Sequence, residues 1–279
     1  MTTLPRSFCT GIAVCALVLC TAQTGFAAGL FADKNLETAI RDVLKKGPKD
    51  QLKAADLNDV FILKARGKKI ANLAGLEKCT NLALIDFGRN SIKDLKPLAG
   101  LTNLQSLDLS FNQITDVTPL AKLVKLQYLQ LEANQLAKLA PLKGLTKLTA
   151  LYLSKNKIKK VGPLAGLKKL ASLYLDGNQV ADITPLKGLK WLASLDLRNN
   201  GIKSVAALSA MTELRYTMLQ GNKIVDLSPL VAMAKKDAAG DRRFAPYWHL
   251  YLAGNPLNAA AKKTHLAELK KIGVRVSMK

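Results

Sequence analysis

The residues of this sequence that could do chemistry form a set suited to binding rather than to catalysis. Only two histidines occur, His249 and His265, and neither has a nucleophile and a carboxylate at matching places in the chain. The sequence also contains no phosphate-binding loop, no metal-spaced cysteine set and no dinucleotide-binding motif. Five of the six tyrosines, by contrast, recur at regular spacing among acidic residues. We therefore expect a binding protein that is not an enzyme and that uses neither a cofactor nor a metal.

Asparagine recurs every 22 residues, and this period sets the frame for every other position. The recurring residues are Asn90, Asn112, Asn134, Asn156, Asn178, Asn200 and Asn222. Leucine-like residues recur eight, five and three positions before the asparagine, and two, five and eight positions after it, with Thr217 at one of these positions in the seventh coil. A fixed period of this kind indicates one supersecondary unit stacked on itself. The sequence thus predicts a solenoid rather than a globular enzyme.

Each unit has a strand, a bend and a return leg. The alternating aliphatic residues before the asparagine predict a short strand with one buried face, parallel to the strand of the next coil. The asparagine amide has donors and an acceptor for backbone groups that the bend leaves unpaired. Proline follows seven positions later in most coils, which favours short 3-10 or extended segments on the return leg. In several coils an aspartate lies four residues after the asparagine, and this aspartate is predicted to cap a turn.

The repeat resembles a known family. The motif LTNLQSLDLSFNQITDVTPLAKL, residues 101–123, is similar to the 22-residue leucine-rich repeats of internalin-like bacterial proteins. The resemblance covers roughly residues 57–257. It implies an α/β leucine-rich repeat solenoid, with a curved parallel β-sheet on the concave face, short 3-10 or extended segments on the convex face, and helical caps at both ends.

Four segments are predicted along the chain. Residues 1–27 are expected to be a signal peptide, 28–56 an N-terminal helical cap, 57–257 the repeats and 258–279 a C-terminal cap. Asp33 is predicted to be the N-cap of the first capping helix, and Asn258 the N-cap of the last. The rhythm fails after Asn222, because an insertion near 234–246 delays the next asparagine. This insertion is either a solvated loop or extended helix, or a basic contact loop anchored by aromatic residues, Phe244 and Trp248.

The N-terminus and the cysteines indicate export. Arg6, an apolar run from residue 12 to residue 20 and small residues near Ala27 are typical of a secretory signal, and the run is too short to span a bilayer. A lipoprotein anchored at Cys20 is the alternative. Only Cys79 lies outside the signal region, and it is expected to pack in the core as a small hydrophobe.

Three positions in each coil point outward from the predicted concave sheet. They lie two, four and six residues before the asparagine. These columns carry the candidate partner-binding residues Asp86, Asp108, Tyr128, Glu132, Tyr152, Tyr174, Asp176, Asp196, Arg198, Tyr216, Met218, His249 and Tyr251. No lysine occupies them in the regular coils, although the chain has a formal net charge of +22 at pH 7. We expect a tyrosine-rich, mildly acidic concave face inside a basic shell.

The charged residues on this face also have purely structural interpretations. Asp176 shares a column with Arg198, so the two are candidates for an ion pair. Asp86 neighbours Lys64 on one side and Asp108 on the other, and adjacent like charges are destabilising. The two aspartates therefore leave a small cost that a basic partner or a cation could relieve.

The function that these features predict is an exported, monomeric binding module, periplasmic or secreted, that contacts a protein or peptide through the concave tyrosines. The alternative is an envelope-associated protein held by its lysines to anionic polymers or a membrane surface. Sequence-specific nucleic-acid binding is not expected, because the aromatic residues and the lysines lie on different faces. No transmembrane segment is predicted in the mature chain.

Overall fold

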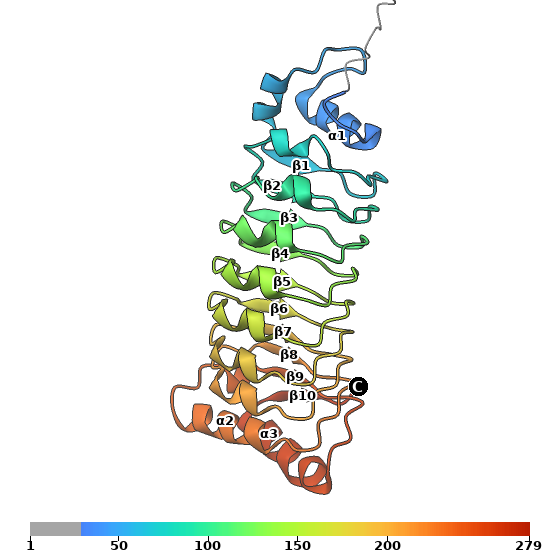
Figure 1. Cartoon of the computed structure of the whole chain (residues 1–279). Helices are drawn as coiled ribbons and strands as arrows, with labels where there is room; N and C mark the ends of the chain where they lie inside the picture. The colour runs from blue at the N-terminus through green and yellow to red at the C-terminus, as the bar shows by residue number, and fades with distance from the viewer. Residues whose placement is uncertain (1–28) are drawn as a thin grey trace, which may run out of the picture.

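The computed structural model describes residues 29–279, which form an elongated solenoid of stacked coils (Figure 1). Ten parallel strands pair in chain order into one unclosed sheet. The strands are β1 (Ile62–Lys64), β2 (Leu84–Asp86), β3 (Ser106–Asp108), β4 (Tyr128–Gln130), β5 (Ala150–Tyr152), β6 (Ser172–Tyr174), β7 (Ser194–Asp196), β8 (Tyr216–Met218), β9 (His249–Tyr251) and β10 (Arg275–Ser277). The predicted leucine-rich repeat solenoid is confirmed. The predicted signal segment and Cys20 lie outside the described residues.

Short 3-10 turns form the return legs. They are η1 (Ala54–Asp59), η2 (Leu76–Lys78), η3 (Lys96–Leu98), η4 (Thr118–Lys122), η5 (Ala140–Gly144), η6 (Gly162–Gly166), η7 (Thr184–Gly188), η8 (Ala206–Ala210) and η9 (Ala245–Tyr247). In most of them proline occupies one of the first two positions, where its missing N–H costs nothing. The predicted turn caps are also confirmed, since Asp116, for example, accepts from the Thr118 amide at 2.9 Å. That bond and a stronger one from the Thr118 hydroxyl lower the pKa of Asp116.

The aliphatic residues of every coil stack into one continuous core. Because the strands pair in 22-residue register, Leu107, Leu129 and Leu151 lie directly beside one another, and all three are buried. Alternate residues on the same strands face outward, as the period of a strand requires.

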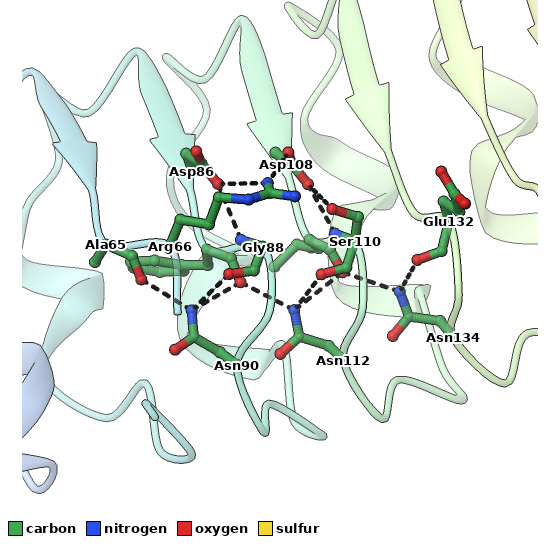
Figure 2. A network of polar contacts seen from close by, with 12 residues as sticks. Ala65, Arg66, Asp86, Gly88, Asn90, Asp108, Ser110, Asn112, Glu132 and Asn134 are labelled. Carbon is green, nitrogen blue, oxygen red and sulfur yellow. Dashed lines mark hydrogen bonds and ion pairs between the residues drawn. The ribbon is translucent and has the colours of Figure 1, made fainter. Parts of the chain in front are cut away.

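The recurring asparagines form a buried ladder inside the bend. In one coil, Asn156 Nδ2 donates to the carbonyls of Leu131 at 2.9 Å and Leu153 at 3.0 Å, and its Oδ1 accepts from the Leu136 amide at 2.9 Å. Figure 2 shows the same donation from Nδ2 to backbone carbonyls at Asn90, Asn112 and Asn134. The ladder replaces backbone hydrogen bonds that the bend cannot make, as predicted from the side-chain chemistry.

Helix α1 (Lys34–Leu44) covers the first coil. Its N-cap is Asp33, as predicted, and the buried face of the helix carries Leu36, Ala39 and Ile40. The second oxygen of Asp33 accepts from the amides of Ala71 and Asn72 at 2.8 and 3.2 Å. One carboxylate thus joins the helix to the repeats.

The insertion after Asn222 is helix α2 (Ser228–Ala239) followed by a tight turn. The carboxylate of Asp237 holds that turn by accepting from three successive amides, Arg243 to Ala245. Phe244 and Trp248 are both buried, so the alternative of a contact loop anchored by these residues is wrong, and the alternative of an extended helix is confirmed. Trp248 instead donates to the hydroxyl of Thr217 at 2.8 Å, which explains the threonine at a core leucine position.

The last coil is closed by a π-helical segment (Ala261–His265), helix α3 (Leu266–Ile272) and strand β10, which pairs with β9. Asn258 accepts from the Ala261 amide at 2.7 Å, in keeping with its predicted capping role. Cys79 is buried as expected, and burial together with Glu77 raises the pKa of its thiol to about 11. Within residues 29–279 no helix is both long and apolar enough to cross a bilayer.

Candidate functional site

The outward face of the sheet carries a stack of three tyrosines. The rings of Tyr152 and Tyr174 lie opposite each other on β5 and β6, with centroids 4.9 Å apart and planes at 28°. Tyr128 on β4 joins them diagonally, 5.4 Å from Tyr152, because the residue directly opposite it is the small Ala150. All three rings are partly exposed. They form a continuous aromatic surface across three coils.

Tyr128 has a strongly perturbed acidity. Burial, the charge of Asp108 and the neighbouring Tyr152 raise the pKa of Tyr128 from 10.0 to about 12. Since the folded-state pKa is the higher one, the contribution of this phenol to stability is present below about pH 10 and is lost as the pH rises through about 12.

We expect Tyr128 to stay protonated at about pH 11, where a free tyrosine is mostly ionised. An ultraviolet absorbance titration of the protein against Tyr128→Phe isolates this phenol, with circular dichroism showing that both remain folded. The difference curve should have its midpoint near pH 12. A midpoint near 10 contradicts the proposed environment.

Arg66 bridges the two adjacent aspartates near the N-terminal end of the sheet. Its Nη1 lies 2.9 Å from Asp108 Oδ2 and 3.4 Å from Asp86 Oδ1 (Figure 2). The guanidinium crosses the intervening coil above Gly88, where a side chain would collide with it. The expected neighbour Lys64 does pair in register with Asp86, but Arg66 makes the ion pairs. The like-charge cost is therefore relieved within the chain.

The remaining concave acids also have partners. Glu132 pairs with Lys155 at 2.9 Å, and Asp176 accepts from the side-chain Nδ2 of Asn199 at 2.8 Å. Arg198 binds Asp196 through Nε and Nη2, at 2.9 and 2.6 Å. The predicted pairing of Asp176 with Arg198 is thus wrong. Asp196 is only 1% exposed, so it offers no surface to a partner.

These pairs change the electrostatic character of the face. Three cations serve four of these acids: Arg66 is shared by Asp86 and Asp108, Lys155 pairs with Glu132 and Arg198 pairs with Asp196. The predicted acidity of the face is therefore reduced but not removed, since Asp176 has only a neutral partner. The hydrogen bond that Lys155 donates to Glu132 and, to a smaller extent, the negative charge of Glu132 raise the pKa of Lys155, so this lysine stays charged.

A second aromatic cluster, at the C-terminal end of the sheet, is basic. The Tyr216 and His249 rings stack with centroids 5.0 Å apart, and Arg275 Nη1 lies 3.1 Å from His249 Nε2. The Arg215 guanidinium lies 5.3 Å from the Tyr247 ring centroid. Together these five side chains line an open hollow of about 390 Å³. Among the described residues neither arginine has a carboxylate within ion-pair distance.

Sequence reasoning missed the cations Arg66, Lys155, Arg215 and Arg275. Arg66 belongs to the first coil, where a lysine replaces the asparagine, so it fell outside the regular columns. Lys155 directly precedes an asparagine, at the bend where the backbone has positive φ, here 55°. Arg275 joins the face only through β10. The signal for Arg66 was Gly88, the one glycine in the regular outward columns.

Comparison with known proteins places this architecture. Residues 102–144 and 146–188 match the model of a family described as Leucine Rich repeats (2 copies). The chain is similar to internalin C2 of Listeria monocytogenes, with 33% identity and a TM-score of 0.69, over 73% of this chain and 91% of that one. No curated protein sequence matches significantly.

Two further structures share the fold at lower identity. An internalin (inlF) of Listeria monocytogenes has 23% identity and a TM-score of 0.52, over 88% of this chain and 95% of that one. The LRR protein LIC12759 of Leptospira interrogans has 22% identity and a TM-score of 0.58, over 73% and 62%. With the internalin C2 match, the repeats identify the class: the chain belongs to the internalin-like bacterial leucine-rich repeat proteins.

Proposed function

We propose that this protein is an exported binding module that holds a protein or peptide partner against its concave sheet. The observation that carries the proposal is the stack of Tyr128, Tyr152 and Tyr174, which crosses three coils and remains partly exposed. Tyrosine supplies a large, amphipathic contact area at low cost in conformational entropy, and it is enriched where partners bind most tightly.

The rest of the face supports the same reading. The ion pairs around the stack are already satisfied within the chain, so a partner need not supply a charge to reach the tyrosines. At the C-terminal end, Arg215 and Arg275 lack carboxylate partners among the described residues. The proposed complement is therefore a partner with apolar or aromatic groups over the stack and an acidic group over the hollow.

The proposed contact residues extend along the exposed columns. They are Asp86, Asp108, Tyr128, Glu132, Tyr152, Tyr174, Asp176, Arg198, Tyr216, Met218, His249 and Tyr251, with Arg215 and Arg275 added and Asp196 removed. Export is proposed from the signal-like residues 1–27 and from the likeness to internalins. We propose a monomer, since each protomer carries its own complete face.

Site-specific photo-crosslinking tests the proposal. A photoreactive residue in place of Met218 lies on the concave face, on the same strand as Tyr216 of the second aromatic cluster, whereas one in place of Lys159 lies beyond the asparagine bend. Cells that make either variant are irradiated and crosslinked proteins are identified by mass spectrometry. The Met218 probe should capture a defined protein that the Lys159 probe does not. Equal capture by both probes, or capture by the Lys159 probe alone, contradicts concave-face binding.

A further inference from the structure

The lysines of four central coils gather along one edge of the solenoid. These lysines, here called the lysine edge, are Lys122, Lys125, Lys143, Lys147, Lys168, Lys169, Lys187 and Lys190, and all are exposed. Each lies in a 3-10 turn, η4, η5 or η7, or in the loop that leads from a turn η4–η7 into the next strand. The lysine edge therefore flanks the side of the sheet where the strands begin.

No acidic residue interrupts this edge. Residues 118–127, 140–149, 162–171 and 184–193 contain no aspartate and no glutamate. None of the eight lysines has an ion-pair partner among the described residues, and one of them, Lys125, donates to a neutral amide, Asn103 Oδ1, at 2.8 Å. The row ends at Glu213, which pairs with Arg243.

The stacking of coils turns this composition into a dense row of like charges. Lys125, Lys147 and Lys169 occupy the same position in successive coils, and adjacent strands are about 4.8 Å apart. Like charges at such a spacing repel one another. The lysines after the asparagine bends also lack ion-pair partners among the described residues, but Asp94, Asp116 and Asp182 lie among them. A row of lysines without intervening acids is therefore the feature of this edge.

The same edge exposes apolar side chains at both of its ends. Val124 is 50% exposed and Trp191 is 62% exposed, and they lie one position apart in the repeat frame, in the loops before β4 and β7. Tryptophan beside lysines is the composition that favours a membrane–water interface, where the ring sits among headgroups and the ammonium groups meet anionic lipid. Single-stranded nucleic acid needs a series of aromatic rings for its bases, whereas Trp191 is the one aromatic residue in the four segments.

We propose that the lysine edge docks the protein on an anionic lipid surface, with Trp191 and Val124 entering the headgroup region. Because the edge runs beside the sheet rather than across it, the docked protein leaves its concave face open. This inference is independent of the partner proposed for that face. Lipid docking and partner capture can therefore fail separately.

Vesicle binding of the purified protein tests the proposal, with Trp191 as the reporter. The other tryptophan, Trp248, is buried in the core. Vesicles of equal parts phosphatidylglycerol and phosphatidylcholine should bind the protein and shift its fluorescence to shorter wavelength, and Trp191→Phe should remove the shift. Binding should be lost in about 1 M salt, where the Debye length is about 3 Å.

Two variants of equal charge make the test specific. The edge variant combines Lys125→Gln, Lys147→Gln, Lys169→Gln and Lys190→Gln, and should bind these vesicles at least a hundredfold more weakly. The control variant combines Lys93→Gln, Lys138→Gln, Lys160→Gln and Lys203→Gln, which lie after the asparagine bends, and should bind like the unchanged protein. Equal loss in both variants overturns the proposal. So does binding to vesicles of phosphatidylcholine alone, or binding to soluble polyphosphate without a fluorescence shift on vesicles.

Discussion

Replacing Tyr152 and Tyr174 together with alanine is expected to weaken partner binding at least a hundredfold. A central interface tyrosine costs about 2 kcal/mol or more when truncated, and a hundredfold corresponds to about 2.7 kcal/mol. The effect on folding should be small, because the buried leucines that directly precede these tyrosines on their strands, Leu151 and Leu173, are untouched. Loss of the ring stacking lowers the free energy of unfolding by about 1 kcal/mol.

Binding to the partner identified by crosslinking is measured by titration calorimetry, with thermal denaturation as the folding check. The matched control is Trp191→Ala, which removes a large exposed aromatic side chain from outside the sheet and should leave affinity for a soluble partner unchanged. If the double tyrosine variant binds as tightly as the unchanged protein, the tyrosine stack is not the contact surface. If the control loses affinity as well, the partner reaches beyond the concave face.

Asn156→Ala is expected to lower the free energy of unfolding by about 3 kcal/mol. The substitution leaves the Leu136 amide without its partner. It also removes one of the two asparagine donors to each of the Leu131 and Leu153 carbonyls, which keep Asn134 and Asn178. Asn156 is only 7% exposed, so water replaces these bonds poorly. An orphaned buried polar group costs about 1–3 kcal/mol, and the lost bonds to the two carbonyls add to the cost of the orphaned Leu136 amide.

Urea denaturation followed by circular dichroism measures this loss, and hydrogen exchange locates it. Exchange should accelerate at the Leu136 amide and in the adjoining coils first, because each coil contacts only its neighbours. Asn58→Ala is the control, since Asn58 is an exposed asparagine outside the ladder. A loss at Asn156 no larger than at Asn58 shows that the ladder does not hold the coils together.

The fold was predictable because its physical cause is periodic. One 22-residue unit specifies a strand, a bend and a return leg, and stacking repeats the same hydrogen bonds and the same leucine contacts in every coil. The capping residues Asp33 and Asn258 were also readable, since capping depends on local chemistry. One sequence-based alternative failed where the period stops. It made Phe244 and Trp248 the exposed anchors of a contact loop, but both are buried, and Trp248 packs in the core beside Thr217.

The electrostatics of the candidate site were not predictable in the same way. A column in the repeat frame shows which residues face outward. The partner of a long charged side chain, however, depends on the length of that side chain and on the space that neighbouring residues leave for it. The side chain of Arg66 crosses a whole coil because Gly88 has no side chain to block it. Arg198 pairs with Asp196, two residues before it in the same coil, rather than with Asp176 in the preceding coil. These choices depend on neighbours in adjacent coils that a single repeat does not contain.

The sequence by itself determined the solenoid, the concave position of the tyrosines and the absence of lysine from the regular concave columns, because all three follow from a period that places each residue on a known face. Only the tertiary structure decided which charges are free. The fold paired most of the concave acids with cations, among them Arg66 from the first coil and Lys155 from a bend. It left Arg215 and Arg275 without carboxylates among the described residues. It also aligned the lysines of four coils along one edge. The reason is that ion pairing depends on distances between coils, whereas burial depends on the pattern within one.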